Sequence, residues 1–345
     1  MGEEAARAAF ASQAIWCERL GSPFTARLVK LLGERLDRTT AVGARVLAWP
    51  GDPAPQADGV PLRLAGALHA HVRRGDAPAL AALYPPAPIP DEAALWREIT
   101  PLLGSEAILS FLDQPPQTNE VGRAAPLMAG LLTVADQFRL PLRLFELGAS
   151  AGLNLLLDRY AHDLGGARAG DPASRLQLKP TWTGPPPPHA EIRVLSRAGV
   201  DLNPLRLPED GERLLAYVWP DQQDRLARLK AALAIGAADP PHVEQGDAAD
   251  WLERTLPAAP RHGAVRVVFH SIAWQYFPAA TQQRIEALMH RLGAEASPQA
   301  PLAWLRYEQQ PADPRHSLRL RTRPGEDRLL AWLHPHGAEV EWVAA

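Results

Sequence analysis

One short segment constrains the fold more than any other. Residues 146–152 read Glu-Leu-Gly-Ala-Ser-Ala-Gly; they follow the apolar run at 140–145 and precede a stretch with helical spacing. The five small residues at 148–152 let the backbone turn sharply, because glycine adopts conformations that side chains disfavour. The segment therefore predicts a tight turn from a buried strand into a helix, the basic unit of a parallel α/β sheet.

The chain before this turn has the spacing of helices. Apolar residues recur three and four positions apart in successive segments, and glycine or proline separates these segments. Residues 1–139 are therefore predicted to form an all-helical domain that serves as a cap over a substrate. The expected helices lie at 6–20, 24–36, 62–73, 92–112 and 118–138.

The pattern changes at residue 140, where short β-rich runs begin to alternate with helices. This alternation favours a mostly parallel sheet over residues 140–345. Strands are expected at 142–147, 191–196, 265–270 and 302–307, with a short one before Gln245, and helices at 153–160, 213–233 and 282–292. The pieces at 318–322, 329–333 and 340–343 predict an antiparallel hairpin at the sheet edge. A proline-rich insertion at 162–190 interrupts the domain, and the proline run 185–188 excludes a central strand there.

Composition narrows the possible partners. A net charge of −3 and a pI near 6.4 provide no basic field for a phosphate backbone, so nucleic acid is not expected as a partner. No leader or membrane-spanning run is evident, and with Cys17 as the one cysteine a cytoplasmic location is expected. The pairs His69-x-His71 and His334-x-His336 lack a clear third ligand, so no metal is expected.

The turn itself admits two chemistries. As Gly148-x-Ser150-x-Gly152 it matches the nucleophile elbow of serine hydrolases, and later acids and histidines occur in the required order. Only helices precede Ser150, however, so the usual oxyanion partner from an earlier strand is missing. As Glu146-x-Gly148-x-Ser150-x-Gly152 it matches a nucleotide-binding loop after a first strand, where glycines permit close approach and helix amides face the ligand.

Further acids follow in the order that the second interpretation needs. Asp201, with Leu202 beside it, can accept both ribose hydroxyls of a nucleotide. It lies 201 − 148 = 53 positions after Gly148, against about 20 in dinucleotide folds, and the proline-rich insertion accounts for most of the excess. Asp247, followed by Ala248, can accept from the exocyclic amine of adenine. Glu146 at the strand end is placed to meet an amino group.

Together, these motifs resemble those of two known protein families. Residues 140–345 resemble the class I S-adenosylmethionine-dependent methyltransferases, a Rossmann-like sheet of seven strands ending in a β-hairpin. Nearly the whole chain is also similar to a bacterial family known as domain of unknown function 2332, in the segments 117–123, 146–156, 199–204, 216–222, 246–251 and 270–276. The resemblance implies S-adenosylmethionine as cofactor, bound by Glu146, Gly148, Ala149, Ser150, Gly152, Asn154, Asp201, Leu202, Asp247, Ala248 and His270.

The same resemblance places the segment 267–276 next to the methyl group and the substrate. Candidate catalytic residues that would remove a proton are His270, Tyr276 and Glu120. Candidate substrate-binding residues, from this segment, the start of the last cap helix and nearby aromatic positions, are Asn119, Glu120, Arg123, Tyr217, Trp219 and Trp274.

The expected acceptor is a small molecule. Phe269-His270-Ser271 stands where many members of the fold carry an acid or an Asn-Pro-Pro-Tyr motif, which argues against methylation of DNA or of protein amides. Two alternatives stay open: a serine hydrolase that uses Ser150, and a non-catalytic nucleotide-binding protein that retains the fold.

Overall fold

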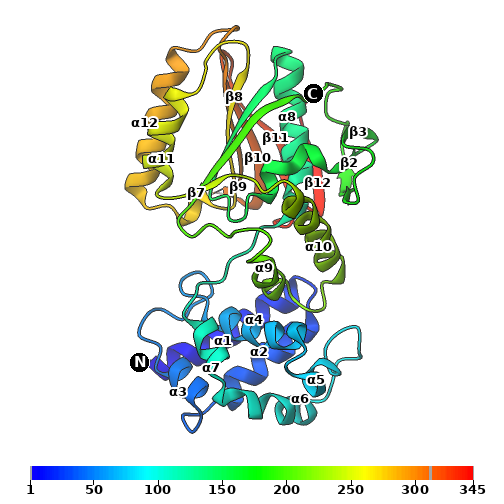
Figure 1. Ribbon diagram of the computed structural model, residues 1–345, viewed down its shortest axis with the longest axis vertical. Helices are drawn as coiled ribbons and strands as arrows, with labels where there is room; N and C mark the ends of the chain where they lie inside the picture. Colours follow the sequence, from blue (N-terminus) through cyan, green and yellow to red (C-terminus); the bar gives the residue numbers. More distant parts are fainter. Residues whose placement is uncertain (1, 311–312, 345) are drawn as a thin grey trace. The chain divides into compact units, whose positions relative to one another are not determined.

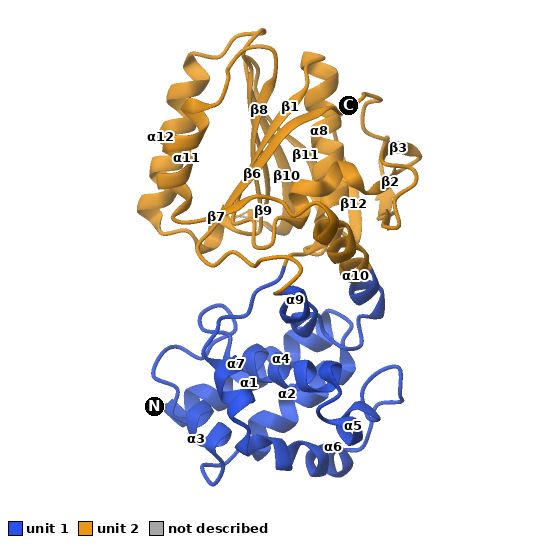
Figure 2. Ribbon diagram, viewed as in Figure 1, with its two compact units in different colours: residues 1–118, 210–227 blue, residues 119–209, 228–345 orange. Residues whose placement is uncertain are grey.

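The computed structural model describes residues 2–310 and 313–344, and the chain forms two compact units (Figure 2). A helical unit comprises residues up to Thr118 together with 210–227, and a sheet unit comprises 119–209 and 228–345. This division differs from the expected boundary at residue 139 in two ways. The segment 119–139 belongs to the sheet unit, and the segment 210–227 belongs to the helical unit.

The helical unit has a core of its own. Phe10, Phe24, Leu32, Leu64 and Leu68 lie at its centre and are at most 1% exposed. Residues 210–227 join this unit because α9 packs along α4, where the ring of Tyr217 leaves no room for a side chain at Gly66. Its helices are α1 (Gly2–Arg19), α2 (Pro23–Arg35), α3 (Ala41–Leu47), α4 (Val60–Arg74), α5 (Pro78–Ala81), α6 (Glu92–Ile99), η1 (Thr100–Gly104), α7 (Glu106–Leu112), α9 (Gly211–Tyr217) and the first part of α10 (Gln223–Ala238).

The sheet unit is built on a nine-stranded sheet (Figure 1). The strands lie in the order β5 (Thr181–Thr183), β12 (Glu339–Trp342), β11 (Asp327–Leu333), β10 (Asp313–Arg323), β9 (Leu302–Gln310), β8 (Val265–Ser271), β1 (Leu142–Leu147), β6 (Val194–Asp201) and β7 (Val243–Gln245). The sheet is mostly parallel, so the prediction of a mixed α/β fold with a helical N-terminal region is confirmed. The expected number of seven strands is wrong.

Five parallel strands form one half of the sheet. Their order β7-β6-β1-β8-β9 is third, second, first, fourth and fifth along the chain, as in doubly wound nucleotide-binding sheets. Every residue of β8 is buried, as expected for a central strand covered on both faces. The direction of winding reverses between β1 and β8, and such a reversal opens a crevice at the carboxyl ends of the two strands.

The other half of the sheet is antiparallel except for its outermost pair, β5 and β12, which is parallel. β9, β10, β11 and β12 follow one another as antiparallel neighbours, which confirms the antiparallel arrangement predicted for the C-terminal pieces. The proline-rich insertion is less irregular than expected, because it contains β5 and a small sheet of β3 (Ala167–Gly170), β2 (Ala161–Leu164) and β4 (Gln177–Leu178). The proline-rich composition of the insertion concealed β5, whereas β12 corresponds to the run expected at 340–343.

Helices cover the two faces of the sheet (Figure 1). α8 (Ala124–Phe138) packs on one face, where Leu305 lies against Gly130 so closely that a side chain there would clash. α11 (Ala248–Ala258) and α12 (Ala279–Ala294) pack side by side on the other, over Phe145, Val268 and Trp304. The remaining short helices of this unit are η2 (Val121–Arg123), η3 (Leu153–Arg159) and η4 (Trp274–Tyr276).

Candidate functional site

The turn after β1 has the backbone that its sequence predicts. Gly148, Ser150 and Gly152 have φ angles of 70°, 55° and 74°, which is the left-handed region. A side chain at Gly148 would approach the Cβ of Ala273 to 2.6 Å, and one at Gly152 would approach Pro241 to 2.7 Å. Ala149 is fully buried and faces Gly199. Packing inside the sheet unit therefore explains both glycines, without any contact to a ligand.

Two residues at this edge have a backbone conformation that residues other than glycine rarely adopt. Ser150 follows β1 with a φ of 55°, and Ile272 follows β8 with a φ of 51°. A residue other than glycine is strained in the left-handed region, at a cost of about 1–3 kcal/mol, and the β-branched Ile272 is the more strained of the two. Strain of this kind concentrates at functional sites, and here it falls on the two strands that flank the reversal point.

Asp201 at the end of β6 stabilises the turn after β1 through hydrogen bonds. Its Oδ2 accepts a hydrogen bond from the amide of Ser150 at 2.9 Å, and its Oδ1 accepts one from the amide of Asn203 at 2.9 Å. Leu202 between them is 60% exposed. The carboxylate thus lies where the sequence predicted it, beside the turn after β1. The Ser150 amide faces Asp201 in this arrangement, so it is not free to face a ligand.

The segment 119–123 joins the loops after β1 and β8. The Oδ1 of Asn119 accepts a hydrogen bond from the amide of Leu153 at 2.9 Å. The Nη1 of Arg123 donates to the carbonyl of Ser271 at 2.9 Å, and its Nε donates to the carbonyl of Pro335 at 3.0 Å. Glu120 is buried and accepts from the amide of Gly122, as the N-cap of η2. All three predicted residues therefore lie at the carboxyl edge of the sheet.

Glu146 is a buried carboxyl group. It is 1% exposed, and Asn154 forms a hydrogen bond with it. Burial, and then the nearby charge of Asp201, raise the pKa of Glu146 well above its usual value of 4.5, while Asn154 and the charge of Arg123 act in the opposite direction. A cation that came close to this carboxyl would favour its ionised form.

His270 forms a pair with a carboxylate that the sequence analysis missed. Its Nδ1 lies 2.6 Å from the Oε1 of Glu308, which also accepts from the amides of Ala273 at 3.0 Å and Trp274 at 3.2 Å. Trp274 stacks on the imidazole with ring centroids 5.1 Å apart. Glu308 lies at the end of β9, a strand without a recognised motif. No sequence motif pointed to Glu308, because its closeness to His270 follows only from the register of β8 and β9, in which Arg306 pairs with His270.

Four polar atoms at this edge are buried without a hydrogen-bond partner among the described residues. They are the Oε2 of Glu146, the Oγ of Ser150, the Oδ1 of Asn154 and the Nε2 of His270. Buried polar atoms in folded proteins are nearly always paired with protein, water or ligand. Glu146 and His270 belong to β1 and β8, whose pairing aligns Glu146 with Phe269, the residue before His270. The carboxyl ends of these two strands therefore hold an unusual concentration of unsatisfied groups.

Asp247 caps the helix that carries Trp251. Its Oδ1 accepts from the amides of Ala249 and Asp250 at 2.9 and 3.1 Å, and its Oδ2 accepts from Thr281 at 3.0 Å. Ala248 is the first residue of α11 and is buried. The helix cap accounts for this aspartate, which has limited accepting capacity left for an adenine amine.

The four aromatic candidate residues do not all lie in one unit. Trp274 and Tyr276 lie in the sheet unit, where Tyr276 is 64% exposed. Tyr217 and Trp219 belong to the helical unit, and Tyr217 packs there on Phe111 with ring centroids 5.4 Å apart. The core of the helical unit, into which α9 packs, therefore accounts for the position of Tyr217.

The histidine pairs are engaged in contacts of their own. His69 and His71 each contact a backbone carbonyl at 3.1 Å, and burial lowers the pKa of His69 to about 4. His334 and His336 pack edge to face. Among the described residues no group of three or more His, Cys, Asp and Glu side chains has a metal-binding arrangement.

A surface groove of 460 Å³ lies at the other end of β1. It is lined by residues of the α8 terminus, the segment that leads into β1 and the segment before β6, including Arg139, His189 and Arg193. Ligands of doubly wound sheets bind at the carboxyl ends of the strands, so this groove is not the candidate site.

Comparison with known proteins assigns the chain to a family without assigning a reaction. Residues 7–342 match the model of a family described as an uncharacterised protein conserved in bacteria, DUF2332. No curated protein matches the sequence. None of the described helices is long and apolar enough to cross a membrane.

Proposed function

The chain belongs to the bacterial family DUF2332, and from its site we propose that it is an S-adenosylmethionine-dependent methyltransferase acting on a small-molecule acceptor. The observation that carries this proposal is the group of buried polar atoms at the carboxyl ends of β1 and β8 that have no partner in the described part of the chain. The amino group of a ligand would satisfy the Glu146 carboxyl, and a hydroxyl or amine of the acceptor would satisfy the Nε2 of His270. The strand order supports the same position, because it puts the reversal of winding between β1 and β8.

The residues present fit the proposed cofactor. Glu146 would meet the amino group of its methionine part, which would convert a neutral buried acid into an ion pair. Asp201, with accepting capacity beyond its two backbone amides, would hold the ribose hydroxyls, next to the exposed Leu202. When bound, the cofactor supplies a methyl group on a sulfonium, which is already a good leaving group.

The chain itself supplies a positioned base. A carboxylate only accepts hydrogen bonds, so Glu308 fixes the hydrogen of the neutral His270 ring on Nδ1 and leaves the Nε2 lone pair available to an acceptor hydroxyl or amine. Trp274 covers the ring and limits access of water. Arg123 holds the loop after β8 through the Ser271 carbonyl. Catalysis would then depend mainly on orientation, with proton removal by His270.

Calorimetry with S-adenosylmethionine and S-adenosylhomocysteine tests the cofactor assignment. We expect binding to the wild type, and a loss of about tenfold or more in affinity for Asp201→Asn, since each hydrogen bond to a charged group contributes about 1.5–3 kcal/mol. Asp239→Asn, at an exposed aspartate that pairs with Arg159, is the matched control and should bind like the wild type. Absence of binding at millimolar ligand would refute the proposal.

Proton release tests the role of Glu146. Binding of S-adenosylmethionine should release protons, because a neutral Glu146 becomes ionised beside the amino group. The effect is measured as a dependence of the binding enthalpy on the ionisation enthalpy of the buffer. Methylthioadenosine lacks the amino acid part and should release none. Equal proton release with both ligands would contradict this assignment.

In the hydrolase alternative, a basic side chain must lie next to the hydroxyl of Ser150. In the part of the chain that the structure describes, the Oγ of Ser150 is buried and has no hydrogen-bond partner, whereas an activated serine requires an adjacent base. Covalent labelling of Ser150 by a fluorophosphonate would favour the hydrolase. Cofactor binding without turnover of any acceptor would favour a nucleotide-binding protein that has lost the reaction.

A further inference from the structure

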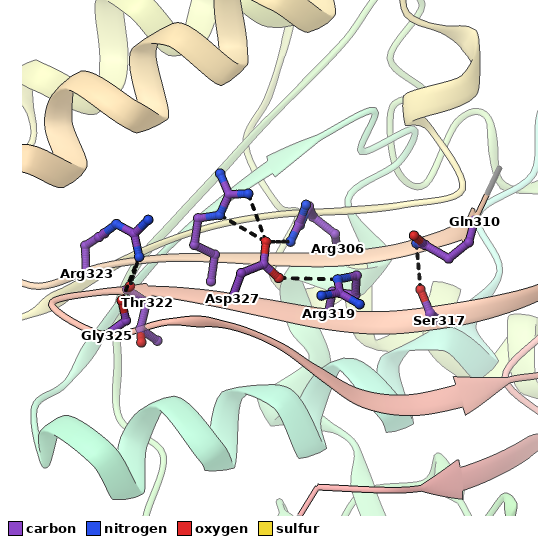
Figure 3. A network of polar contacts seen from close by, with 9 residues as sticks. Arg306, Gln310, Ser317, Arg319, Thr322, Arg323, Gly325 and Asp327 are labelled. Atoms are coloured by element: carbon purple, nitrogen blue, oxygen red, sulfur yellow. Dashed lines mark hydrogen bonds and ion pairs between the residues drawn. The ribbon is translucent and has the colours of Figure 1, made fainter. Parts of the chain in front are cut away.

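The antiparallel half of the sheet carries three arginines around a single carboxylate (Figure 3). Arg306 of β9 and Arg319 and Arg321 of β10 form ion pairs with Asp327 of β11, at N–O distances of 2.5, 3.3 and 2.8 Å. Three guanidinium groups and one carboxylate leave a net charge of 3 − 1 = +2 on this arginine cluster.

The register of the strands forces these charges together. Arg306 and Arg319 are directly opposite each other in the antiparallel pair of β9 and β10, and Arg321 is opposite Asp327. Like charges directly opposite each other destabilise a sheet. Asp327 compensates only one of the three positive charges, so a second anion would stabilise the arrangement.

The cluster has many more donors than its carboxylate can occupy. Each guanidinium carries five N–H groups, and the hydrogen bonds from the three arginines to Asp327 are four in number. The Nε of Arg306 is buried and has no partner among the described residues. The side chains of Arg319 and Arg321 are each 32% exposed, so unused donors are accessible from solvent.

An aromatic ring holds two of the arginines in place. The guanidinium carbons of Arg306 and Arg321 lie 5.0 and 5.6 Å from the centre of the Trp304 ring, and Trp304 itself is 2% exposed. A ring in this position fixes the donors before any ligand binds, which lowers the entropic cost of binding.

The cluster is adjacent to the proposed base. Arg306 pairs with His270 across β8 and β9, and neighbouring strands are about 4.8 Å apart. Glu308, which orients His270, lies two residues further along the same strand, on the same face as Arg306. An anionic group held by the arginines would therefore place the rest of its molecule near the imidazole.

We propose that Arg306, Arg319 and Arg321 bind a divalent oxyanion of the phosphate class, and that this group is carried by the methyl acceptor. A phosphate monoester has a charge of about −1.5 to −2 at neutral pH and accepts paired hydrogen bonds from arginine, which matches the net charge and the free donors of the cluster. The assignment to the acceptor rests on the proposed function, whereas the oxyanion site does not.

Calorimetric titration of the full chain with inorganic phosphate, at constant ionic strength, tests the site. We expect saturable binding, weakened about tenfold or more by Arg319→Gln, since each bond to a charged group contributes strongly. Asp327→Asn removes the competing anion, and it should tighten phosphate binding several-fold. Arg315→Gln is the control, because Arg315 pairs with Asp313 and Glu341 instead. No saturable binding, or equal losses in Arg319→Gln and Arg315→Gln, would overturn the site.

A second titration, with phenyl phosphate, separates a phosphate ester from free phosphate. Trp274 is half-buried and contacts Trp304 at a centroid distance of 5.6 Å, so an aromatic ester should bind more tightly than phosphate if an organic substrate uses this face. Equal affinity for the two would overturn the assignment to the acceptor. Neither titration contains S-adenosylmethionine, so phosphate binding without cofactor binding would retain the oxyanion site and remove the proposed function.

Discussion

At the scale of single residues, the candidate site is unusual for the raised pKa of a buried acid and for its unsatisfied hydrogen-bonding groups. It does not contain an activated nucleophile among the described residues. Burial raises the pKa of Glu146 well above its usual value, and the buried hydroxyl of Ser150 has no hydrogen-bond partner in the described part of the chain. The sequence identified both positions from the spacing of one heptapeptide. It could not reveal the raised pKa of Glu146, because that shift depends first on burial in the folded sheet unit and then on the charge of Asp201, which is distant along the chain.

Substitution of Glu146 should change the pH dependence of stability. Below pH 4.5, the usual pKa of this side chain, both the folded and the unfolded chain hold the proton. Above it the unfolded chain releases its proton first, so the free energy of unfolding of the wild type falls, by at most about 1.4 kcal/mol per pH unit, until the raised folded pKa is passed.

Glu146→Gln removes this contribution. The variant should gain stability relative to the wild type as the pH rises from 4.5 towards neutrality, as measured by urea denaturation at several pH values, while its affinity for S-adenosylmethionine falls. A constant difference in stability across that range would show that Glu146 is ionised in the folded protein.

Substitution of Glu308 should change the tautomer of His270. Glu308→Gln retains an oxygen that accepts the same three hydrogen bonds, so Nδ1 should keep its hydrogen. Glu308→Leu removes these bonds, which should release the tautomer and lower the stability by about 1–3 kcal/mol. Nitrogen-15 NMR of the imidazole distinguishes the two forms. An Nε2–H tautomer in the wild type would contradict the proposed base.

At the scale of elements, the turn after β1 connects sequence with packing. Its glycines were expected to admit a ligand, but Gly148 is needed because the loop after β8 packs on it through Ala273. The turn, the strand and the first helical segment were all predictable, since they depend on local spacing. The contact with Ala273 was not, because it joins residues more than a hundred positions apart.

Gly148→Ala should therefore destabilise the sheet unit more than a left-handed backbone alone would. We expect a loss of about 2–4 kcal/mol from the combined backbone strain and overpacking. Gly263→Ala is the matched control, because Gly263 has a φ of 74° but no atom within 4 Å of its added Cβ, and it should lose only about 1–2 kcal/mol. Equal losses in urea denaturation would mean that the loop after β8 moves aside.

At the scale of the whole molecule, periodicity predicted the succession of elements better than their grouping. The helical spacing before residue 139 and the β-rich runs after it were both correct. The segment 119–139 nevertheless belongs to the sheet unit, because α8 covers the face that carries Leu305, and α9 belongs to the helical unit, because Tyr217 packs on α4. Spacing reveals which face of a helix is buried, but not which partner buries it.

Hydrogen exchange tests whether the cofactor binds to the sheet unit. Addition of S-adenosylmethionine should slow the exchange of amides at 119–123, 146–154, 201–203 and 270–274, all in the sheet unit. Amides of α1 and α2 should be unaffected, since the residues that fit the cofactor lie outside the helical unit. Protection confined to α1 and α2 would contradict the assignment of the site to the carboxyl edge of the sheet.

The pairing of β5 with β12 has a consequence for solubility. β12 would otherwise end the sheet with a row of unpaired backbone groups, which is a template for self-association. The insertion strand covers that row, and it is itself only three residues long, with Gly184 and the prolines 185–188 directly after it. Proline has no amide hydrogen to offer to a further strand. The proline-rich insertion thus terminates the sheet and protects the protein from edge-to-edge aggregation.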